Sequence, residues 1–224
     1  MNIKSINKVK YFFFIFIVFI LSCFSCQKNS DEKKVRVDFS RKEEIHFLPG
    51  GSGILLKAAV SAMVSPKENF FHYSENFNYI SSKTGKKILF KQRKSYREVN
   101  ELLHHQELDF AFICSGAYVE AKWDFDAEIL AIPQIKGETI YHAYIVVRKD
   151  SNLDRFEDLK GHSFAFTDPL SNTGCLYPRY LVKEMNQSEE KFFSQIIYTH
   201  AHDYSIQAVE NKLVDGAQCR QSYF

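Results

Sequence analysis

The sequence is poor in the residue patterns that build disulfide-linked or metal-bound folds. Its 224 residues include only five cysteines, and the four other than Cys23, which are Cys26, Cys114, Cys175 and Cys219, form no C-x-x-C pair among themselves. Their wide separation supports neither a disulfide scaffold nor a zinc knuckle. Histidine pairs at i, i+4 and Cys/His clusters are also missing. We therefore expect no metal site, although His46, His72, His104, His105, His142, His200 and His202 are available as ligands.

Signatures of nucleotide binding and of hydrolysis are missing too. The glycine cluster at residues 49–53 lacks the Gly-Lys-Ser/Thr of a P-loop, so it predicts a flexible connection between a strand and a helix. No Gly-x-Ser-x-Gly esterase elbow occurs. Cys114 or Cys175 could be paired with His142 or His202 as nucleophile and base, but no signature supports such a pair, and a buried Cys is usually a small hydrophobe. We predict no enzymatic activity and no cofactor.

The excess of positive charge is confined to the N-terminus. The chain has 29 Lys and Arg against 27 Asp and Glu, and Lys4, Lys8 and Lys10 belong to residues 1–22, which contain no acid. Removal of this segment leaves 26 basic and 27 acidic residues. A nearly neutral chain gives no reason to expect a nucleic-acid partner.

Residues 1–22 have the organisation of an export signal, because the three lysines precede an apolar run at residues 11–21. Eleven apolar residues are too few to span a bilayer comfortably, which disfavours a transmembrane anchor. Residues 20–23, Ile-Leu-Ser-Cys, resemble the cleavage box of bacterial lipoproteins, although Leu21 is atypical there. We predict that Cys23 receives the lipid, with Cys26 as the alternative, and that the polar residues 23–35 form a lipidated tether.

Beyond the tether, short apolar strands alternate with helical segments. We expect strands at residues 45–48, 88–90, 108–113, 128–133, 140–148, 164–166 and 195–198. Helices are expected at residues 54–64, 70–81, 153–159 and 206–213, and after the capping box Ser95-x-x-Glu98, with a polar turn at 114–118. This alternation predicts an α/β fold with parallel strands, whose ligands bind beyond the carboxyl ends of the strands.

The most informative stretch joins the strand at 164–166 to a helix. Ser171, Asn172 and Thr173 precede a glycine at the predicted helix start, and Pro178 fits only near that start. Free N–H groups and the helix dipole favour an anion there. The same side chains are ordinary N-caps, so a capped helix that binds no ligand is the alternative.

Residues 165–174, followed by Pro178-Arg-Tyr-Leu, are similar to a segment of the phosphate/phosphite/phosphonate-binding proteins of ABC importers. In that family a Ser-Thr-Ser-Gly turn at a helix N-terminus holds the phosphorus oxyanion, and Asn172 here replaces the usual Thr. Further similar blocks follow the family's order, at residues 83–87, 147–153, 157–161, 202–203 and 208–215. The resemblance covers about residues 45–218.

The resemblance implies a two-lobe type II periplasmic-binding-protein fold, with lobe one at residues 36–140 and an incomplete lobe two at 141–217. It implies ligand contacts from Ser171, Asn172, Thr173, His202 and Tyr96, and we add Ser115 and Tyr118 from the turn after the strand at 108–113. The alternative role for Tyr96 is that of a half-buried core residue. The alternative role for His202 is that of a helix cap or a surface residue.

The implied function is that of a monomeric, lipid-anchored substrate-binding protein on the extracytoplasmic face of a bacterial membrane. It would bind phosphate, phosphite or a phosphonate and deliver it to an ABC permease and its ATPase. A sensory module of the same fold and a truncated remnant are the alternatives, and a zinc receptor is disfavoured because the sequence has no i, i+4 His pair and no Cys/His cluster.

Residues 218–224 depart from the family pattern, which usually reads Val-Asp-Ser-Leu-Ile-Phe at this place. A reading frame shifted by one base can restore Asn-Val-Asp-Ser-Leu from possible codons for this segment. We therefore expect residues 218–224 to be a frameshift tail, which resequencing of the gene would test.

Overall fold

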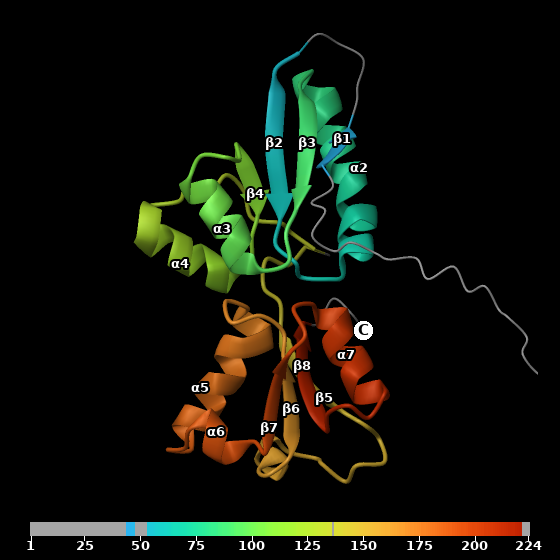
Figure 1. Ribbon diagram of the computed structural model, residues 1–224, viewed down its shortest axis with the longest axis vertical. Helices are drawn as coiled ribbons and strands as arrows, with labels where there is room; N and C mark the ends of the chain where they lie inside the picture. The colour runs from blue at the N-terminus through green and yellow to red at the C-terminus, as the bar shows by residue number, and fades with distance from the viewer. Residues whose placement is uncertain (1–43, 48–52, 136, 221–224) are drawn as a thin grey trace, which may run out of the picture. The chain divides into compact units, whose positions relative to one another are not determined.

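The computed structural model describes residues 44–47, 53–135 and 137–220, which all belong to one folded unit. The predicted export signal, the tether with Cys23 and Cys26, most of the glycine cluster and residues 221–224 lie outside the described residues. Within the described ranges, no helix combines the length and the apolar character needed to cross a membrane. Two four-stranded sheets, each with its own helices, make up lobe one and lobe two (Figure 1).

Lobe one is built on a sheet of strand order β1-β3-β2-β4. Its elements are β1 (Glu44–Phe47), β2 (Leu55–Val60), α2 (Pro66–Thr84), β3 (Lys87–Gln92), α3 (Tyr96–His104), β4 (Phe110–Phe112) and α4 (Ser115–Phe125). β2 runs parallel to both β3 and β4, whereas β1 is antiparallel to β3. α2 lies on one side of the sheet and α3 and α4 on the other (Figure 1). The Phe77 and Phe90 rings, 5.0 Å apart, join α2 to the sheet.

The expectation of a helix at residues 54–64 is wrong, because this segment contains strand β2. β2 is a central strand with a neighbour on each edge, and Ala58, Ala59 and Val60 are all buried. A short continuous apolar run fits a strand buried on both faces as well as a buried helix, and periodicity cannot separate the two.

Two further expectations in lobe one need correction. The segment 114–118, predicted as a turn, is the start of α4, with Cys114 as its N-cap residue. The strand predicted at 128–133 does not form, and in the part of the chain that the structure describes no strand pairs with it. Its apolar side chains face solvent, with Leu130 80% exposed. A strand needs a partner for its backbone N–H and C=O groups, so β-propensity alone does not create one.

Lobe two is built on a sheet of strand order β5-β8-β6-β7. Its elements are β5 (Ala143–Val147), η1 (Phe156–Leu159), β6 (Ser163–Phe166), η2 (Asn172–Leu176), α5 (Tyr177–Glu184), α6 (Glu189–Phe192), β7 (Gln195–Tyr198), α7 (His202–Glu210) and β8 (Gly216–Arg220). β6 is parallel to β7 and β8, and β5 is antiparallel to β8. α5 and α6 lie on one side of the sheet and α7 on the other (Figure 1). The strands predicted at 164–166 and 195–198 are confirmed.

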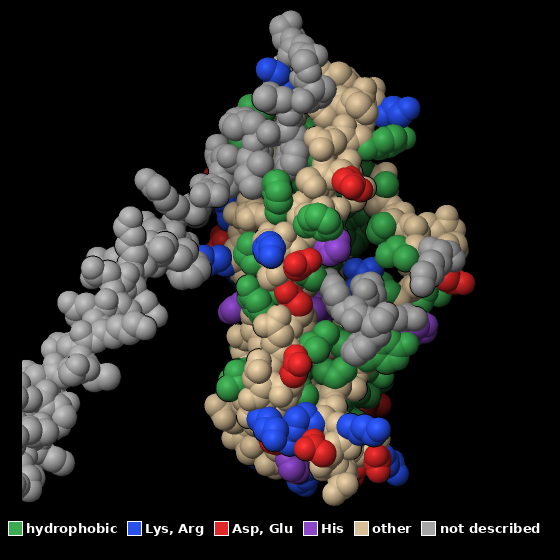
Figure 2. All heavy atoms as spheres, turned by 90° about the vertical axis from the view of Figure 1, so that its right-hand side faces the viewer, with side chains coloured by type: hydrophobic (Ala, Val, Ile, Leu, Met, Phe, Trp, Pro, Cys, Tyr) green, Lys and Arg blue, Asp and Glu red, His purple; other side chains and the backbone are tan. Residues whose placement is uncertain are grey.

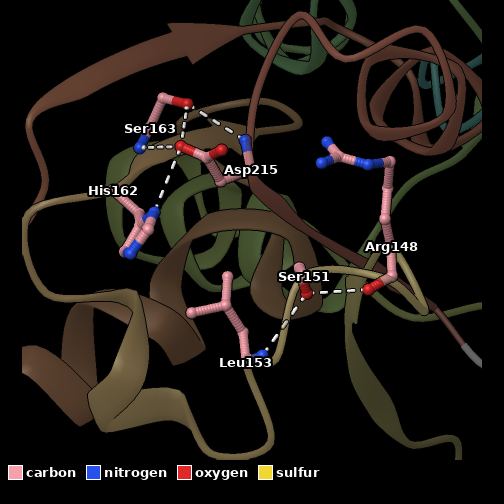
Figure 3. Close-up of polar contacts among 6 residues, drawn as sticks. All are labelled: Arg148, Ser151, Leu153, His162, Ser163 and Asp215. Atoms are coloured by element: carbon pink, nitrogen blue, oxygen red, sulfur yellow. Dashed lines mark hydrogen bonds and ion pairs between the residues drawn. The ribbon is translucent and has the colours of Figure 1, made fainter.

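Asp215 fastens the beginning of β8 to the beginning of β6 (Figure 3). Its carboxylate accepts hydrogen bonds from the Ser163 backbone N–H at 2.9 Å and hydroxyl at 2.7 Å, and it lies 3.4 Å from the His162 ring Nδ1. These donors lower the pKa of the Asp215 carboxyl, with the Ser163 hydroxyl as the largest cause. Residues 218–220, the first three of the predicted frameshift tail, lie in β8 between β5 and β6.

Acidic and basic side chains are interspersed on the side of the chain that carries α2 and α7 (Figure 2). This side shows no large patch of a single sign. The distribution agrees with the nearly neutral charge of the chain beyond its N-terminal segment.

Candidate functional site

The predicted anion turn leads directly into a helix. Ser171 is the N-cap of η2, and its hydroxyl oxygen accepts a hydrogen bond from the Gly174 N–H at 3.0 Å. η2 continues into α5, where Pro178 occupies the first turn as predicted. Ser171 has no exposed surface and Thr173 is also buried, whereas Asn172 is exposed. Ser171 is thus a helix cap, as the alternative reading had it, but its O–H hydrogen can still be donated to a ligand.

Thr167 packs behind the turn and explains the glycine in it. A Cβ atom on Gly174 would lie 2.4 Å from the Thr167 Oγ1 and 2.8 Å from the Ser171 Oγ. The Thr167 N–H also donates to the Gly174 carbonyl at 2.9 Å. Any side chain at position 174 would therefore push the turn away from the end of β6.

His202 is the first residue of α7 and is 99% buried, with a relative exposure of 1%. Its ring Nδ1 lies 3.2 Å from the Thr167 Oγ1, which places the imidazole beside the anion turn. Burial, helped by the positive charge of Arg220, lowers the pKa of His202 to about 4. The imidazole is therefore neutral at physiological pH and offers one donor and one acceptor.

The start of α4 in lobe one reaches the same turn. A Cβ on Gly116 would lie 2.3 Å from the Leu170 carbonyl oxygen and 3.1 Å from the Asn172 backbone nitrogen, so the two segments touch. Ser115, the preceding residue, is exposed and its hydroxyl lies 2.6 Å from the Tyr141 hydroxyl. The structure thus brings Ser115 close to the Ser171–Thr173 turn.

The two predicted tyrosines are placed differently. Tyr118 is half-buried on α4, three residues after Ser115. The Tyr96 side chain belongs to the lobe-one core cluster and has no exposed surface, so it is fully buried rather than half-buried as the alternative had it. The Tyr96 backbone N–H, in contrast, donates to the Asp168 carboxylate of lobe two at 3.1 Å.

Sequence reasoning missed four residues that surround the turn: Thr167, Asp168, Tyr141 and Arg220. The Arg220 guanidinium carbon lies 4.3 Å from the centre of the Tyr141 ring, and its Nη1 lies 4.0 Å from the Met63 sulfur. Met63 in turn accepts a backbone hydrogen bond from His202 at 3.0 Å. A signal for Thr167 and Arg220 was available, because both stand at the carboxyl ends of parallel strands.

These contacts form a ring of neighbouring residues that starts and ends at the turn. The turn touches Gly116, the neighbouring Ser115 bonds Tyr141, Tyr141 stacks on Arg220, Arg220 lies beside Met63 and His202, and His202 returns to the turn through Thr167, as described above. Residues of both lobes take part. The ring offers hydroxyl, amide, imidazole and guanidinium donors together with a helix N-terminus, which is the chemistry of an anion site.

The described ranges also contain histidine, cysteine and acidic side chains outside the ring. There, no three His, Cys, Asp or Glu side chains form a group that could hold a metal ion. Burial raises the pKa of the Cys175 thiol to about 11 and that of Cys219 to about 12. A thiol protonated this firmly is a poor nucleophile.

The two α/β lobes, each built on its own four-stranded mixed sheet, have the type II periplasmic-binding-protein fold. The chain belongs to the family described as "ABC transporter, phosphonate, periplasmic substrate-binding protein", whose model matches residues 58–223. Members of this family are substrate-binding proteins of transport systems rather than enzymes.

Known proteins resemble the chain over part of their length. It is 27% identical to the phosphate-import protein PhnD of Mycolicibacterium smegmatis over 150 residues, which are 62% of this chain and 46% of the relative. A binding-protein component of an ABC phosphonate transporter from Pseudomonas aeruginosa superposes with a TM-score of 0.71 and 24% identity, covering 76% of this chain and 58% of the other. PhnD1 from Prochlorococcus marinus in complex with methylphosphonate gives a TM-score of 0.68 and 18% identity, covering 75% and 64%. The chain therefore spans about half to two thirds of the length of these proteins.

Proposed function

We propose that this protein is the extracytoplasmic substrate-binding component of an ABC importer and that it binds a phosphorus oxyanion between its two lobes. Membership of the family supports the transport role, and the names of the relatives point to phosphate and phosphonates. The partners of this role are a permease and its ATPase, and the protein acts as a monomer.

The observation that carries the proposal is the contact between the Ser171–Thr173 turn and the start of α4, which a Gly116 without a side chain permits. A ligand at the N-terminus of η2 and α5 would meet Asn172 from lobe two and Ser115 from lobe one. Contacts from both lobes make ligand affinity depend on lobe closure, because a ligand shifts a conformational equilibrium only by binding one state better.

The proposal is tested by calorimetric titration of the full chain, purified in mild detergent, with phosphate, phosphite and methylphosphonate. Asn172→Ala should weaken binding about 10- to 100-fold, since a hydrogen bond to a charged group contributes about 1.5–3 kcal/mol. The matched control is Asn211→Ala, because Asn211 is also exposed but lies at the far end of α7. The proposed function would be refuted if the wild-type chain bound none of the three anions.

We further propose that the protein is anchored to the membrane by lipid on Cys23. Expression in a bacterium with radiolabelled palmitate should label the wild-type chain and the Cys26→Ala variant but not Cys23→Ala. If Cys26→Ala loses the label and Cys23→Ala keeps it, Cys26 carries the lipid. If the wild-type chain is not labelled, the proposed lipid anchor is refuted.

A further inference from the structure

Arg220 is a half-buried cation without an anionic partner in the described part of the chain. Its Nε is buried and has no hydrogen-bond partner there, and no carboxylate of the described residues forms an ion pair with it. Its Nη1 lies 4.0 Å from the Met63 sulfur, which is a weak acceptor. Other arginines of the same lobe differ, since Arg179 forms a two-bond ion pair with Glu189 at 2.7 Å.

Such a cation calls for an anion that is not among the described residues. A charged group that is withdrawn from water without a partner is destabilising. The guanidinium presents several N–H donors in a planar fork that matches two oxygens of a phosphate or phosphonate. The Arg220 guanidinium lies over the Tyr141 ring, and its Nε has no hydrogen-bond partner among the described residues.

The position of Arg220 assigns the anion to the site already described. The guanidinium stacks on Tyr141, whose hydroxyl bonds Ser115 at 2.6 Å, and Ser115 adjoins the Gly116 that touches the Asn172 backbone. On its other side, Met63 links Arg220 to His202. β6 runs parallel to both β7 and β8, so Thr167 after β6, His202 after β7 and Arg220 at the end of β8 all lie toward the carboxyl-end edge of the sheet.

Strand β8 also carries a second buried polar side chain without a hydrogen-bond partner among the described residues. Gln218 is fully buried, and neither its Oε1 nor its Nε2 has a hydrogen-bond partner among the described residues. Side chains two residues apart on a strand share a face, so Gln218 and Arg220 extend from the same face of β8. β8 also lies in contact with η2, the helix that begins at the anion turn.

We propose that Arg220 is a ligand-binding residue that supplies the positive charge of the site, and that the site therefore takes a phosphorus oxyanion with two negative charges. This proposal deepens the proposed function and depends on it. It also requires that residue 220 of the protein is arginine, as in the given sequence. Among the residues of the ring, His202 is kept neutral by burial, so the helix N-terminus and Arg220 carry the positive charge. A singly charged anion leaves part of this charge uncompensated.

The experiment compares two probes, inorganic phosphate at pH 8 and hypophosphite, a small anion with one charge, by calorimetry on the full chain. Wild type should bind phosphate at least about tenfold tighter than hypophosphite. Arg220→Gln should weaken phosphate binding about 10- to 100-fold, with a smaller loss for hypophosphite, and Arg220→Lys should recover part of the phosphate affinity. Arg155→Gln is the control, because Arg155 is exposed and pairs with Glu157 on the surface.

The outcomes separate this proposal from the proposed function. If Asn172→Ala loses phosphate but Arg220→Gln does not, Arg220 is no ligand contact and the oxyanion site stands. Equal losses for both anions in Arg220→Gln overturn the preference for two charges. If wild type binds neither anion, both proposals fail. Should Arg220→Gln not fold, Arg220→Lys decides: full phosphate affinity in a chain with lysine overturns the paired-oxygen contact.

Discussion

The carboxylate of Asp168, in lobe two, accepts a hydrogen bond from the backbone N–H of Tyr96, in lobe one, at 3.1 Å. Tyr96 is the first residue of α3, so a negative charge from one lobe lies at the helix N-terminus of the other. A second carboxylate repeats the arrangement, because Asp203 accepts from the backbone N–H of Ser65 at the start of α2 at 3.0 Å. The lobes are thus held by two acidic side chains at two helix starts.

Replacement of Asp168 by alanine should lower the free energy of unfolding by about 1–3 kcal/mol, since it leaves a buried N–H of α3 without its acceptor. Asp168 is 1% exposed and also accepts from the Leu170 N–H at 2.9 Å, so no water can substitute easily. Urea unfolding at pH 7 measures the loss. Asp168→Asn should lie between the two chains, and Asp154→Ala, an exposed carboxylate, should change little. Equal midpoints for Asp168→Ala and wild type would contradict the interlobe role.

Much of the fold could be predicted from local sequence pattern. Apolar runs followed by polar turns predicted β6 and β7. Ser95 predicted the start of α3, where its hydroxyl oxygen accepts a hydrogen bond from the Glu98 N–H at 3.2 Å. The Glu98 carboxylate bonds the Lys94 N–H rather than that of Ser95, so only half of the capping box forms. β2 and the segment 128–133 were missed because strand identity depends on partners distant in sequence.

Only those parts of the candidate site that carry a local sequence motif could be predicted. The turn at Ser171 and the histidine at position 202 carry local signatures, and the structure brings them together through Thr167. Tyr141 and Arg220 carry none, because an arginine or tyrosine becomes informative only when its neighbours in space are known. Arg220 and Tyr141 are 79 positions apart and meet at 4.3 Å.

Gly116→Ala should destabilise the protein by about 1–3 kcal/mol, as expected for an overpacked contact. In an ordinary helix the same change stabilises by up to about 1 kcal/mol, so the sign of the effect tests the contact with Leu170 and Asn172. The clash at 2.3 Å should also displace the anion turn and weaken phosphate binding. Thermal unfolding with and without phosphate measures both effects. Val119→Ala, on the exposed side of the same helix, is the control and should stay within about 0.5 kcal/mol.

Asp215→Asn should destabilise the chain by about 1 kcal/mol, a value reduced for the partial exposure of this carboxylate. The lowered pKa of Asp215 means that its stabilisation is present above the pKa of the unfolded chain and is lost as pH falls through the folded value. The gap between wild type and Asp215→Asn should therefore narrow below about pH 4. Asp150→Asn breaks an exposed pair with Arg148 and should be nearly neutral at every pH. A gap that stays constant down to acid pH would show that the carboxylate charge contributes nothing.

The buried imidazole of His202 should make the free energy of unfolding depend on pH between its folded and unfolded pKa values. Its pKa is about 4 in the folded protein, below the ordinary value of 6.5, because burial and Arg220 outweigh the hydrogen bond to the Gln218 backbone and the charge of Asp203. Between these values the unfolded chain binds more protons, so stability rises with pH and is complete above about pH 6.5.

Denaturant unfolding of wild type and His202→Gln at pH 4.5 and pH 7.5 isolates this contribution, since the carboxylates titrate in both chains. Acidification should cost wild type on the order of 2–3 kcal/mol more than His202→Gln. The exposed His72, which pairs with Glu68, provides the control variant His72→Gln, whose pH profile should follow that of wild type. Parallel profiles for wild type and His202→Gln would mean that the imidazole is hydrated enough to titrate normally, and the anion turn would then have a charged histidine beside it at mildly acidic pH.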